Sequence, residues 1–269
     1  MVYIYSPCLS INENGHLTIS GCDTTALAKQ YGTPIYVISE EEVRRICRSY
    51  TESFQKYYNG NGRPIYASKA FNCKEMCRVV TSEGLDVEVV SGGELYTALQ
   101  VDSKFGLDLE SGEAFFAAKR ALKMDNVKLI GLHCHIGSQV MEKEPFVHAA
   151  EVMLGLHHRI YKELEVELEQ LNLGGGFGIH YLETDDFIPY HEYMQEVSAK
   201  ISEVCAKYGI KLPRIYIEPG RSIVGEAGIT LYTVGNIKEI PHVRNYVAID
   251  GGMYENPRYA LYQSDYTCL

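Results

Sequence analysis

The stretch PIYASKAFNCKEMCRVVTSEG, residues 64–84, begins as a short apolar strand and continues, after Asn72, with apolar residues at helical spacing. Four more apolar runs end in glycine or polar clusters: LDVEVVS (85–91), VKLIGLHCHIGS (127–138), LEQLNLGGGFG (168–178) and PRIYIEPG (213–220). Helical patterns separate these runs, at residues 110–123, 146–164 and 190–209. Such alternation predicts an α/β fold, in which helical crossovers join the strands of a parallel sheet.

Length and composition narrow the class of protein. A chain of 269 residues with 46% hydrophobic and 22% charged residues has the composition of a globular protein. Its net charge of −10, without a long basic run, argues against a nucleic-acid partner. No apolar stretch approaches the roughly 18 residues of a membrane helix, and the N-terminus has no signal-peptide pattern. The eight cysteines lack C-x-x-C spacing, which indicates reduced thiols and a cytoplasmic protein.

The two ends of the chain differ from its middle. After Arg221 the sequence is rich in β-formers with Gly and Asn turns and has no helical period. We expect an α/β barrel over residues 31–225 and the start of a small all-β domain over residues 226–269. The first 30 residues are expected to associate with that β domain.

A lysine stands at the end of the first apolar strand. Burying the ammonium of Lys69 is costly unless the group is paired or discharged. The simple alternative is that Lys69 reaches the surface where the strand ends. Chemically active side chains also follow the other strands, and in an α/β barrel that edge carries the active site.

The segment HCHIGSQ, residues 133–139, places two histidines two positions apart on a predicted strand, hence on one face. They could ligate a metal, or form a satisfied pair in the core. A third alternative is a flat imidazole lying on an aromatic ligand, with Gly137 and Ser138 offering donors to an anion. A metal would need further ligands, for which Glu218 is one candidate, and we predict no metal.

Two glycine-containing segments complete the set. In LNLGGGFG, Gly174, Gly175 and Gly176 could cradle a phosphate with their N–H groups or could form a tight bend. In IEPGR, Glu218 could face a ring nitrogen and Gly220 an anion, or the glutamate could pair with Arg221. Together these parts suit pyridoxal 5′-phosphate, whose aldehyde Lys69 would hold covalently, and which takes up the electrons of a carbanion.

Several motifs resemble one known family. In this order the chain contains YASKA, GLDVEVVSGGEL, DSKFGL, GLHCHIGSQ, LGGGFG, EPGR and DGGM followed by PRYALY. This combination resembles diaminopimelate decarboxylase, a fold-III enzyme dependent on pyridoxal phosphate, and the HIGSQ and EPGR forms favour this branch over the ornithine and arginine decarboxylases. The resemblance implies an alanine-racemase/ornithine-decarboxylase-like (β/α)8 barrel and decarboxylation of meso-2,6-diaminopimelate to L-lysine, the last step of lysine biosynthesis. It also implies a homodimer.

The resemblance assigns roles to particular residues. Lys69, His135 and Glu218 would be catalytic, as the cofactor lysine, the imidazole stacked on the ring and the partner of the pyridine nitrogen. The cofactor-binding set would be Lys69, His135, Ser138, Gly174, Gly175, Gly176, Glu218 and Gly220. The distal end of the substrate would be held by Arg221, Arg258 and Tyr262, because a guanidinium suits a carboxylate.

The chain also departs from the family. Its barrel-like part, residues 63–221, holds five predicted strands and is shorter than the typical barrel of about 250 residues. Roughly 80 to 90 residues are expected to be missing near residues 100–101, by comparison with that size. Tyr259 replaces the family's proline. The C-E-S-x-D-like motif and tyrosine of the family's C-terminal domain are absent before Leu269, and Cys268 is not expected to replace the family's cysteine.

Three functions therefore remain open. The first is a diaminopimelate decarboxylase in shortened form, with little or no turnover. The second is a non-catalytic or regulatory relative that binds pyridoxal phosphate. The third is a barrel metallohydrolase that uses His133 and His135.

Overall fold

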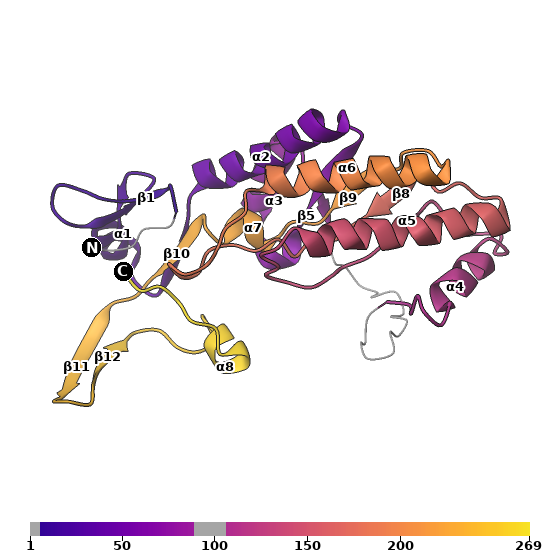
Figure 1. Ribbon diagram of the computed structural model, residues 1–269. Coiled ribbons are helices and arrows are strands. Elements are labelled where there is room, and N and C mark those ends of the chain that lie inside the picture. The colour runs from indigo at the N-terminus through magenta and orange to yellow at the C-terminus, as the bar shows by residue number, and fades with distance from the viewer. Residues whose placement is uncertain (1–5, 89–105) are drawn as a thin grey trace. The chain divides into compact units, whose positions relative to one another are not determined.

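The computed structural model describes residues 6–88 and 106–269 of the chain, which form two compact units (Figure 1). One unit takes in the described residues up to Arg45 together with Ile179–Asp186 and Ile223–Leu269. The other, called the sheet unit below, takes in the described residues of Ile46–Gly178 and Phe187–Ser222. The predicted break at 100–101 and the Gly-Gly turn after Ser91 lie outside the described residues.

The sheet unit contains a parallel five-stranded sheet with the order β6-β5-β9-β8-β7. Its strands are β5 (Gly62–Ala67), β6 (Asp86–Glu88), β7 (Gly131–His133), β8 (Gln170–Asn172) and β9 (Arg214–Ile217). These are the five strands that the sequence predicts. Strands β7, β8 and β9 are shorter than their apolar runs because the last residues of each run leave the ladder and form the loop beyond it.

Alternation along the strands separates the two faces of this sheet. Leu171 and Ile215 are paired across β8 and β9, and both are buried. Asn172 is paired with His133 on one side and with Tyr216 on the other, and this row lies on the opposite, less buried face. The residues two positions beyond this row follow the ends of the strands, so they lie together at the C-terminal edge of the sheet.

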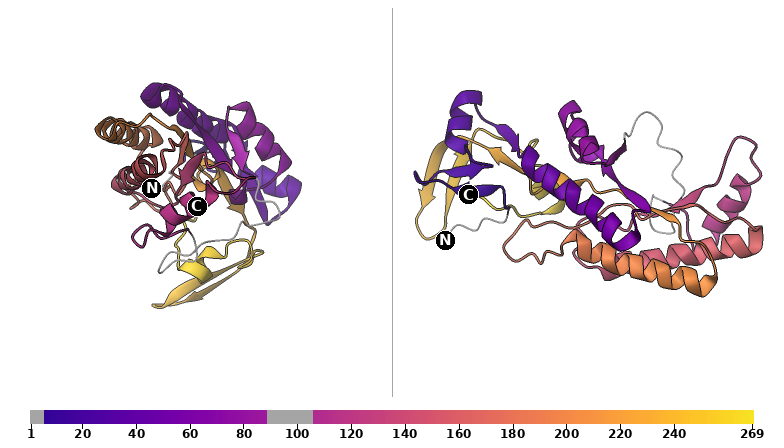
Figure 2. Two further views of the ribbon diagram at one scale, coloured as in Figure 1. Left: turned by 90° about the vertical axis from the view of Figure 1, so that its right-hand side faces the viewer. Right: turned by 90° about the horizontal axis from the view of Figure 1, so that it is seen from above.

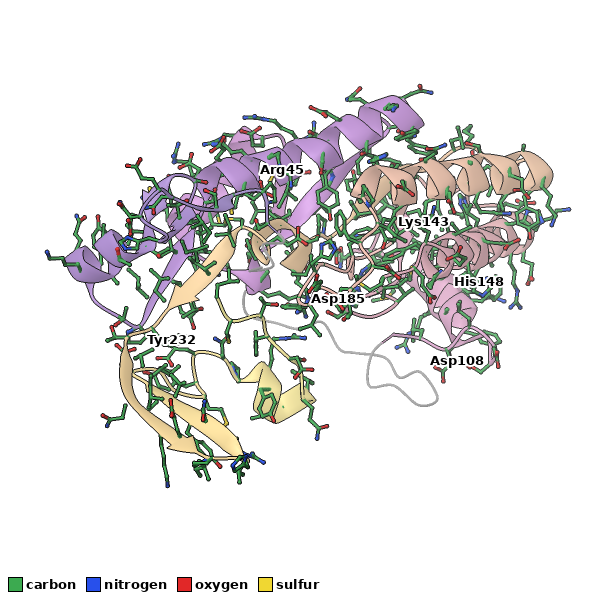
Figure 3. All side chains as sticks on the ribbon, turned by 60° about the vertical axis from the view of Figure 1, so that its left-hand side comes forward. Arg45, Asp108, Lys143, His148, Asp185 and Tyr232 are labelled. Carbon is green, nitrogen blue, oxygen red and sulfur yellow. The ribbon has the colours of Figure 1, made fainter. Side chains whose placement is uncertain are left out.

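Helices cover the buried face. They are α2 (Glu40–Tyr58), α3 (Lys74–Ser82), α4 (Glu113–Ala121), α5 (Glu144–Leu164) and α6 (Tyr190–Tyr208). Helix α5 has a proline in its first turn, where no backbone N–H is needed. Helix α6 ends at Gly209, whose φ of 65° suits glycine. The two helices run side by side (Figures 1 and 2). Lys143, labelled in Figure 3, joins them because its ammonium pairs with Glu192 and Glu196 at 3.3 and 2.5 Å.

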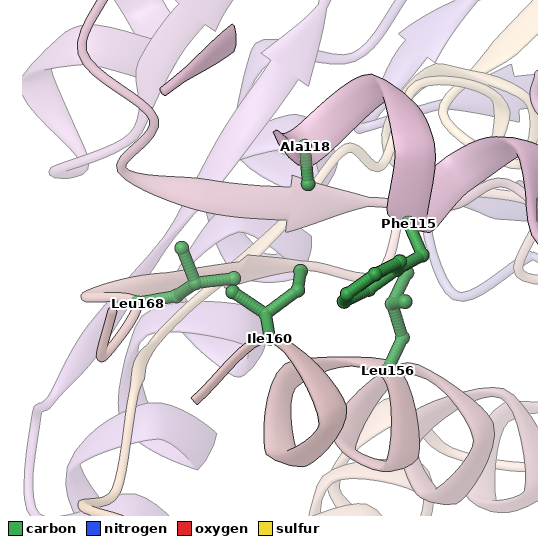
Figure 4. Packing of buried hydrophobic residues seen from close by; sticks show 5 residues of the cluster. All are labelled: Phe115, Ala118, Leu156, Ile160 and Leu168. Atoms are coloured by element: carbon green, nitrogen blue, oxygen red, sulfur yellow. The ribbon is translucent and has the colours of Figure 1, made fainter. Parts of the chain in front are cut away.

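The core of the sheet unit has two parts. Figure 4 shows α4 packed on α5, with Phe115 and Ala118 facing Leu156, Ile160 and the buried Leu168. The second part is aromatic, and its stacked pair has ring centroids 4.6 Å apart. That pair and the two tyrosines that meet it edge to face are Phe146, Phe177, Tyr190 and Tyr193.

The other unit is mostly antiparallel. Its strands are β1 (Leu9–Ile11), β2 (Leu17–Ile19), β3 (Cys22–Asp23), β4 (Ile35–Ile38), β10 (Gly228–Leu231), β11 (Val234–Ile240) and β12 (Arg244–Ile249). Its short helices are α1 (Thr24–Tyr31) and α8 (Arg258–Tyr262), and α7 (Arg221–Val224) lies where the chain passes between the units. Strands β4 and β10, far apart in sequence, pair with each other, as do β11 and β12.

The observed architecture confirms the predicted fold class: a parallel sheet covered by helices, accompanied by small antiparallel sheets. The predicted domain boundaries at 30/31 and 225/226 stay a prediction. Over the part of the chain that the structure describes, no helix is both long and apolar enough to cross a membrane.

Candidate active site

Hydrogen bonds beyond the ends of the strands bring four loops together in the sheet unit. The N–H of Cys134 donates to Asn172 at 3.0 Å, and that of Leu173 donates to Tyr216 at 2.9 Å. The N–H of Glu218 then donates to the carbonyl of Gly174 at 2.8 Å. On the far side of β9, the N–H of Ala67 donates to Pro219 at 3.0 Å. The segments after β7, β8, β9 and β5 therefore meet at one edge of the sheet.

The triple glycine is required by this close packing. Gly174 has φ = +69°, and a Cβ on it would lie 2.5 Å from the carbonyl oxygen of Cys134. A Cβ on Gly175 would collide with the carbonyl oxygen of Glu218, and one on Gly176 would collide with that of Gly137. The tight bend therefore needs a chain without Cβ atoms here, and the predicted phosphate cradle stays a prediction.

Glu218 lies in the middle of the edge and is held by two neighbours. The amide of Asn172 donates to its Oε1 at 2.7 Å, and Nε2 of His133 lies 3.5 Å from its Oε2. Burial alone would raise the pKa of Glu218, but the contact and charge of His133, with the bond from Asn172, lower it overall. The carboxylate contact in turn raises the pKa of His133. Glu218 is therefore an ionised group, as a partner for a protonated ring nitrogen must be.

The imidazole of His135 differs from that of His133 in its contacts and in the direction of its pKa shift. Its Nδ1 accepts a hydrogen bond from the N–H of Gly175 at 3.3 Å. Burial, and then the charge of Lys69, lower the pKa of His135 below its usual value. The ring is therefore neutral, and the strand ends before it, at His133, so the prediction that both histidines belong to one strand is wrong. The reason is that the backbone of Cys134 and His135 packs on the glycine loop.

Lys69 lies in the single turn η1 (Ser68–Ala70) directly after β5, and its side chain is exposed. The desolvation cost considered from the sequence therefore does not arise, because the strand ends two residues earlier, at Ala67. The charge of Lys69 lowers the pKa of both His133 and His135, and Glu218 raises both. An exposed amine and an ionised carboxylate thus act on the same two imidazoles.

The remaining predicted residues of this edge are Ser138, Gly220 and Arg221. The guanidinium of Arg221 donates to the hydroxyl of Ser138 at 3.0 Å, which joins the loop after β7 to the start of α7. A Cβ on Gly220 would lie 3.1 Å from the Cβ atoms of Ala67 and Ala70, the residues that flank the turn of Lys69. Gly220 therefore allows the segment after β9 to pack closely on that turn.

Arg258 and Tyr262 belong to the other unit, in α8. There the guanidinium of Arg258 lies over the rings of Tyr181 and Tyr262, 5.4 and 5.6 Å from their centroids, and donates to Ser264 at 3.3 Å. Their predicted contact with substrate stays a prediction.

Two residues of the site have contacts that the sequence did not predict. One is Asn172: an Asn two residues before a glycine bend is a common start of an Asx turn, and its Oδ1 accepts from the N–H of Gly174 at 2.9 Å. The other is His133, predicted as a metal ligand, a core residue or a flat ring on a ligand, which lies beside Glu218. Among the described residues, no group of three or more His, Cys, Asp and Glu side chains is placed to hold a metal ion.

A cavity of about 270 Å³ lies on the less buried face of the sheet, next to the row of His133, Asn172 and Tyr216. Ile65 and Gln170 line it as well. In a complete barrel this face points to the interior, which side chains of all strands fill. The cavity is therefore the hollow expected on the interior face of a barrel sheet whose described part has five strands.

The donor set fits the cofactor expected from the sequence. Lys69 offers an accessible amine, Glu218 a charged carboxylate and His135 a neutral flat ring. Lys69, Glu218 and His135 are the groups that an aldehyde, a protonated pyridine nitrogen and an aromatic ring require. The loop Gly174–Gly176 has no side chains, but the N–H groups of Gly174 and Gly175 already donate to Asn172 and His135.

The chain is similar to known proteins. The family model described as "Pyridoxal-dependent decarboxylase, pyridoxal binding domain" matches residues 40–103 and 97–225. Diaminopimelate decarboxylase of Bacillus methanolicus is 37% identical over 334 residues, covering 96% of this chain and 77% of the relative. The enzyme of the same name from Bacillus subtilis is 36% identical over 337 residues, covering 95% and 75%. Both alignments are longer than the chain, so the relatives have residues within the matched region that have no counterpart here.

A solved structure agrees. The crystal structure of diaminopimelate decarboxylase from M. jannaschii superposes with a TM-score of 0.85 at 28% identity, covering 97% of this chain and 77% of that one. The same protein has also been solved in complex with L-lysine. The family model matches in two pieces that meet at residues 97–103, around the position where the sequence predicts missing strands.

Proposed function

The chain belongs to the diaminopimelate decarboxylase family of pyridoxal-dependent decarboxylases, and we propose that it removes one carboxylate of meso-2,6-diaminopimelate to give L-lysine and CO₂. The bond that breaks joins the D-configured carbon to its carboxylate, and the electron pair stays on that carbon until a proton replaces CO₂. The observation that supports this assignment is that the segments carrying Lys69 and Glu218 meet at one edge of the sheet, where the N–H of Ala67 donates to the carbonyl of Pro219 at 3.0 Å.

Pyridoxal phosphate supplies the chemistry when bound, as an electron sink for the pair that decarboxylation releases. Lys69 would hold the aldehyde carbon covalently through its Nζ. Glu218, ionised between Asn172 and His133, would keep a proton on the ring nitrogen and so strengthen that sink. His135, neutral, would lie flat against the ring without adding a competing charge.

The loops would bind the two anionic ends. Ser138, Gly174–Gly176 and Gly220 would surround the phosphate. Gly174 and Gly175 would shape this loop, since their N–H groups already donate to Asn172 and His135. Arg221, Arg258 and Tyr262 would hold the distal carboxylate and amino group of the substrate. A homodimer and a cytoplasmic location complete the proposal, and light scattering on the purified protein measures the first.

The test is covalent binding of the cofactor. Addition of pyridoxal phosphate to the purified protein is expected to give an absorbance band near the blue edge of the visible, and Lys69→Ala should remove it. Lys74→Ala is the matched control, because Lys74 is exposed and only five residues away, at the start of α3. Equal spectra of the two variants would contradict the assignment of Lys69.

A second candidate is a relative that binds the cofactor without turnover. Two observations favour it: the sheet has five strands among the described residues, and the relatives have residues inside the matched region without counterpart here. Release of lysine from meso-diaminopimelate separates the two candidates, because both bind the cofactor and one of them alone turns substrate over.

A further inference from the structure

Glu218 is held by side chains from two neighbouring strands, one for each carboxylate oxygen. Asn172, the last residue of β8, donates to Oε1 at 2.7 Å. His133, the last residue of β7, faces Oε2 at 3.5 Å. The two residues are cross-strand partners in the sheet, so the backbone ladder sets their spacing. These two contacts, one on each oxygen, restrict rotation of the carboxylate about its last bond.

Asn172 has a second contact that gives it a wider role. Its Oδ1 accepts from the N–H of Gly174 while its Nδ2 serves Glu218, and these two partners determine which way the amide points. One side chain therefore connects the glycine loop with the carboxylate. A backbone bond from Glu218 N–H to Gly174 O, at 2.8 Å, runs parallel to this connection.

We propose that Asn172 and His133 are positioning residues that orient Glu218 toward the ring nitrogen of the cofactor, and that Asn172 couples this carboxylate to the phosphate-binding loop. The proposal rests on the proposed function for the identity of the ligand. The contacts of Asn172 and His133 with Glu218 are present in the protein without ligand, so they can be tested separately.

The charges around His133 favour its pairing with Glu218. The groups that act on its imidazole are Glu218, Glu88, Lys69 and His135. Glu218 has the largest effect and Glu88 adds to it, while Lys69 opposes them. The net result is a raised pKa, so the imidazolium and the carboxylate form a charged pair in weakly acidic solution.

The first experiment separates the two contacts of Asn172. Asn172→Ser keeps a short acceptor for the N–H of Gly174 but is too short to reach Glu218. The dissociation constant for pyridoxal phosphate, measured by absorbance, is expected to rise about tenfold, since a hydrogen bond to a charged group is lost. The bound cofactor should also lose its protonated ring form at a lower pH than in the wild type. The melting temperature of the protein without ligand should change little.

The matched control is Gln170→Ala. Gln170 lies on the same strand and face, two residues before Asn172, and lines the same cavity. This variant should keep the wild-type dissociation constant and spectrum. If Asn172→Ser and Gln170→Ala bind the cofactor equally well and with the same pH dependence, the proposal is overturned.

The second experiment needs no cofactor. The pKa of His133, followed by NMR of its imidazole in the protein without ligand, should lie above 6.5 and fall in Glu218→Gln. An unchanged pKa of His133 in that variant would overturn the proposed contact between His133 and Glu218. If the wild type fails to bind pyridoxal phosphate while the pKa of His133 does respond to Glu218→Gln, the proposed function fails, but the contact that orients Glu218 is confirmed.

Discussion

At the scale of single residues, the two histidines of HCHIGSQ illustrate how neighbours in sequence acquire opposite properties. His133 ends a strand beside a carboxylate, which raises its pKa. His135 lies on the glycine loop, where burial and the charge of Lys69 lower its pKa. The first can thus carry a charge that stabilises Glu218, while the second presents a neutral ring. The same residue type serves two purposes because the backbone path differs over two positions.

This difference leads to a prediction of pH-dependent stability. The pKa of His133 is raised from 6.5, so its pairing stabilises the fold fully below 6.5 and is lost as the pH rises through the folded value. The pKa of Glu218 is lowered from 4.5, so its contribution is present above 4.5 and is lost as the pH falls through its folded value. His133→Gln should therefore lower the free energy of unfolding most between pH 4.5 and 6.5, and much less above the folded-state pKa of His133.

Urea unfolding of the wild type and of His133→Gln across this range measures the effect. His148→Gln is a useful control, since that histidine is exposed on α5 (Figure 3). If the loss of unfolding free energy in His133→Gln does not vary with pH, the imidazole contributes through packing and not through its charge.

At the scale of elements, the glycine loop and helix α5 contain glycines of opposite kinds. A Cβ on Gly175 would collide with the carbonyl oxygen of Glu218, so Gly175→Ala should destabilise the protein by about 1–3 kcal/mol, the usual cost of overpacking. Gly155, within α5, has nothing within 4 Å of such a Cβ. Gly155→Ala should therefore stabilise by about 0.5–1 kcal/mol. Thermal unfolding distinguishes the two signs, and destabilisation by both variants would contradict the distinction.

The contact of α4 with α5 allows a second prediction at this scale. Ile160 is fully buried against Phe115 and Leu168, so Ile160→Ala should cost about 2–5 kcal/mol of unfolding free energy. Val152 lies on the same helix but is 37% exposed, and Val152→Ala should stay within about 0.5 kcal/mol of the wild type. Chemical denaturation of both variants is the measurement. Similar costs would mean that α4 does not pack on α5 as Figure 4 shows.

At the scale of the whole molecule, the described part of the sheet has β6 and β7 at its two ends. A (β/α)8 barrel closes because its first and last strands pair, which removes such ends and fills the interior. Here the interior face of the sheet instead borders a cavity of about 270 Å³ beside His133 and Asn172. Water in that hollow would weaken the electrostatic interactions on which the site depends.

We therefore expect the 269-residue chain to release lysine from meso-diaminopimelate only slowly, although above the level of Lys69→Ala. Mass spectrometry of the product measures this, with an intact relative such as the Bacillus subtilis enzyme as the positive control. Robust decarboxylation by the purified chain would show that five strands suffice for turnover and would remove the non-catalytic candidate.

The sequence by itself determined the strands, the helices between them and the family, because apolar periodicity and glycine placement are local properties of the chain. It also named Lys69, Glu218 and the triple glycine, since residues at the ends of parallel strands must meet at one edge. The tertiary structure alone decided that Lys69 is exposed, that His133 and Asn172 grip Glu218, and where each strand ends. Those outcomes depend on pairing between β7, β8 and β9, whose partners lie some 40 residues apart and leave no local signal.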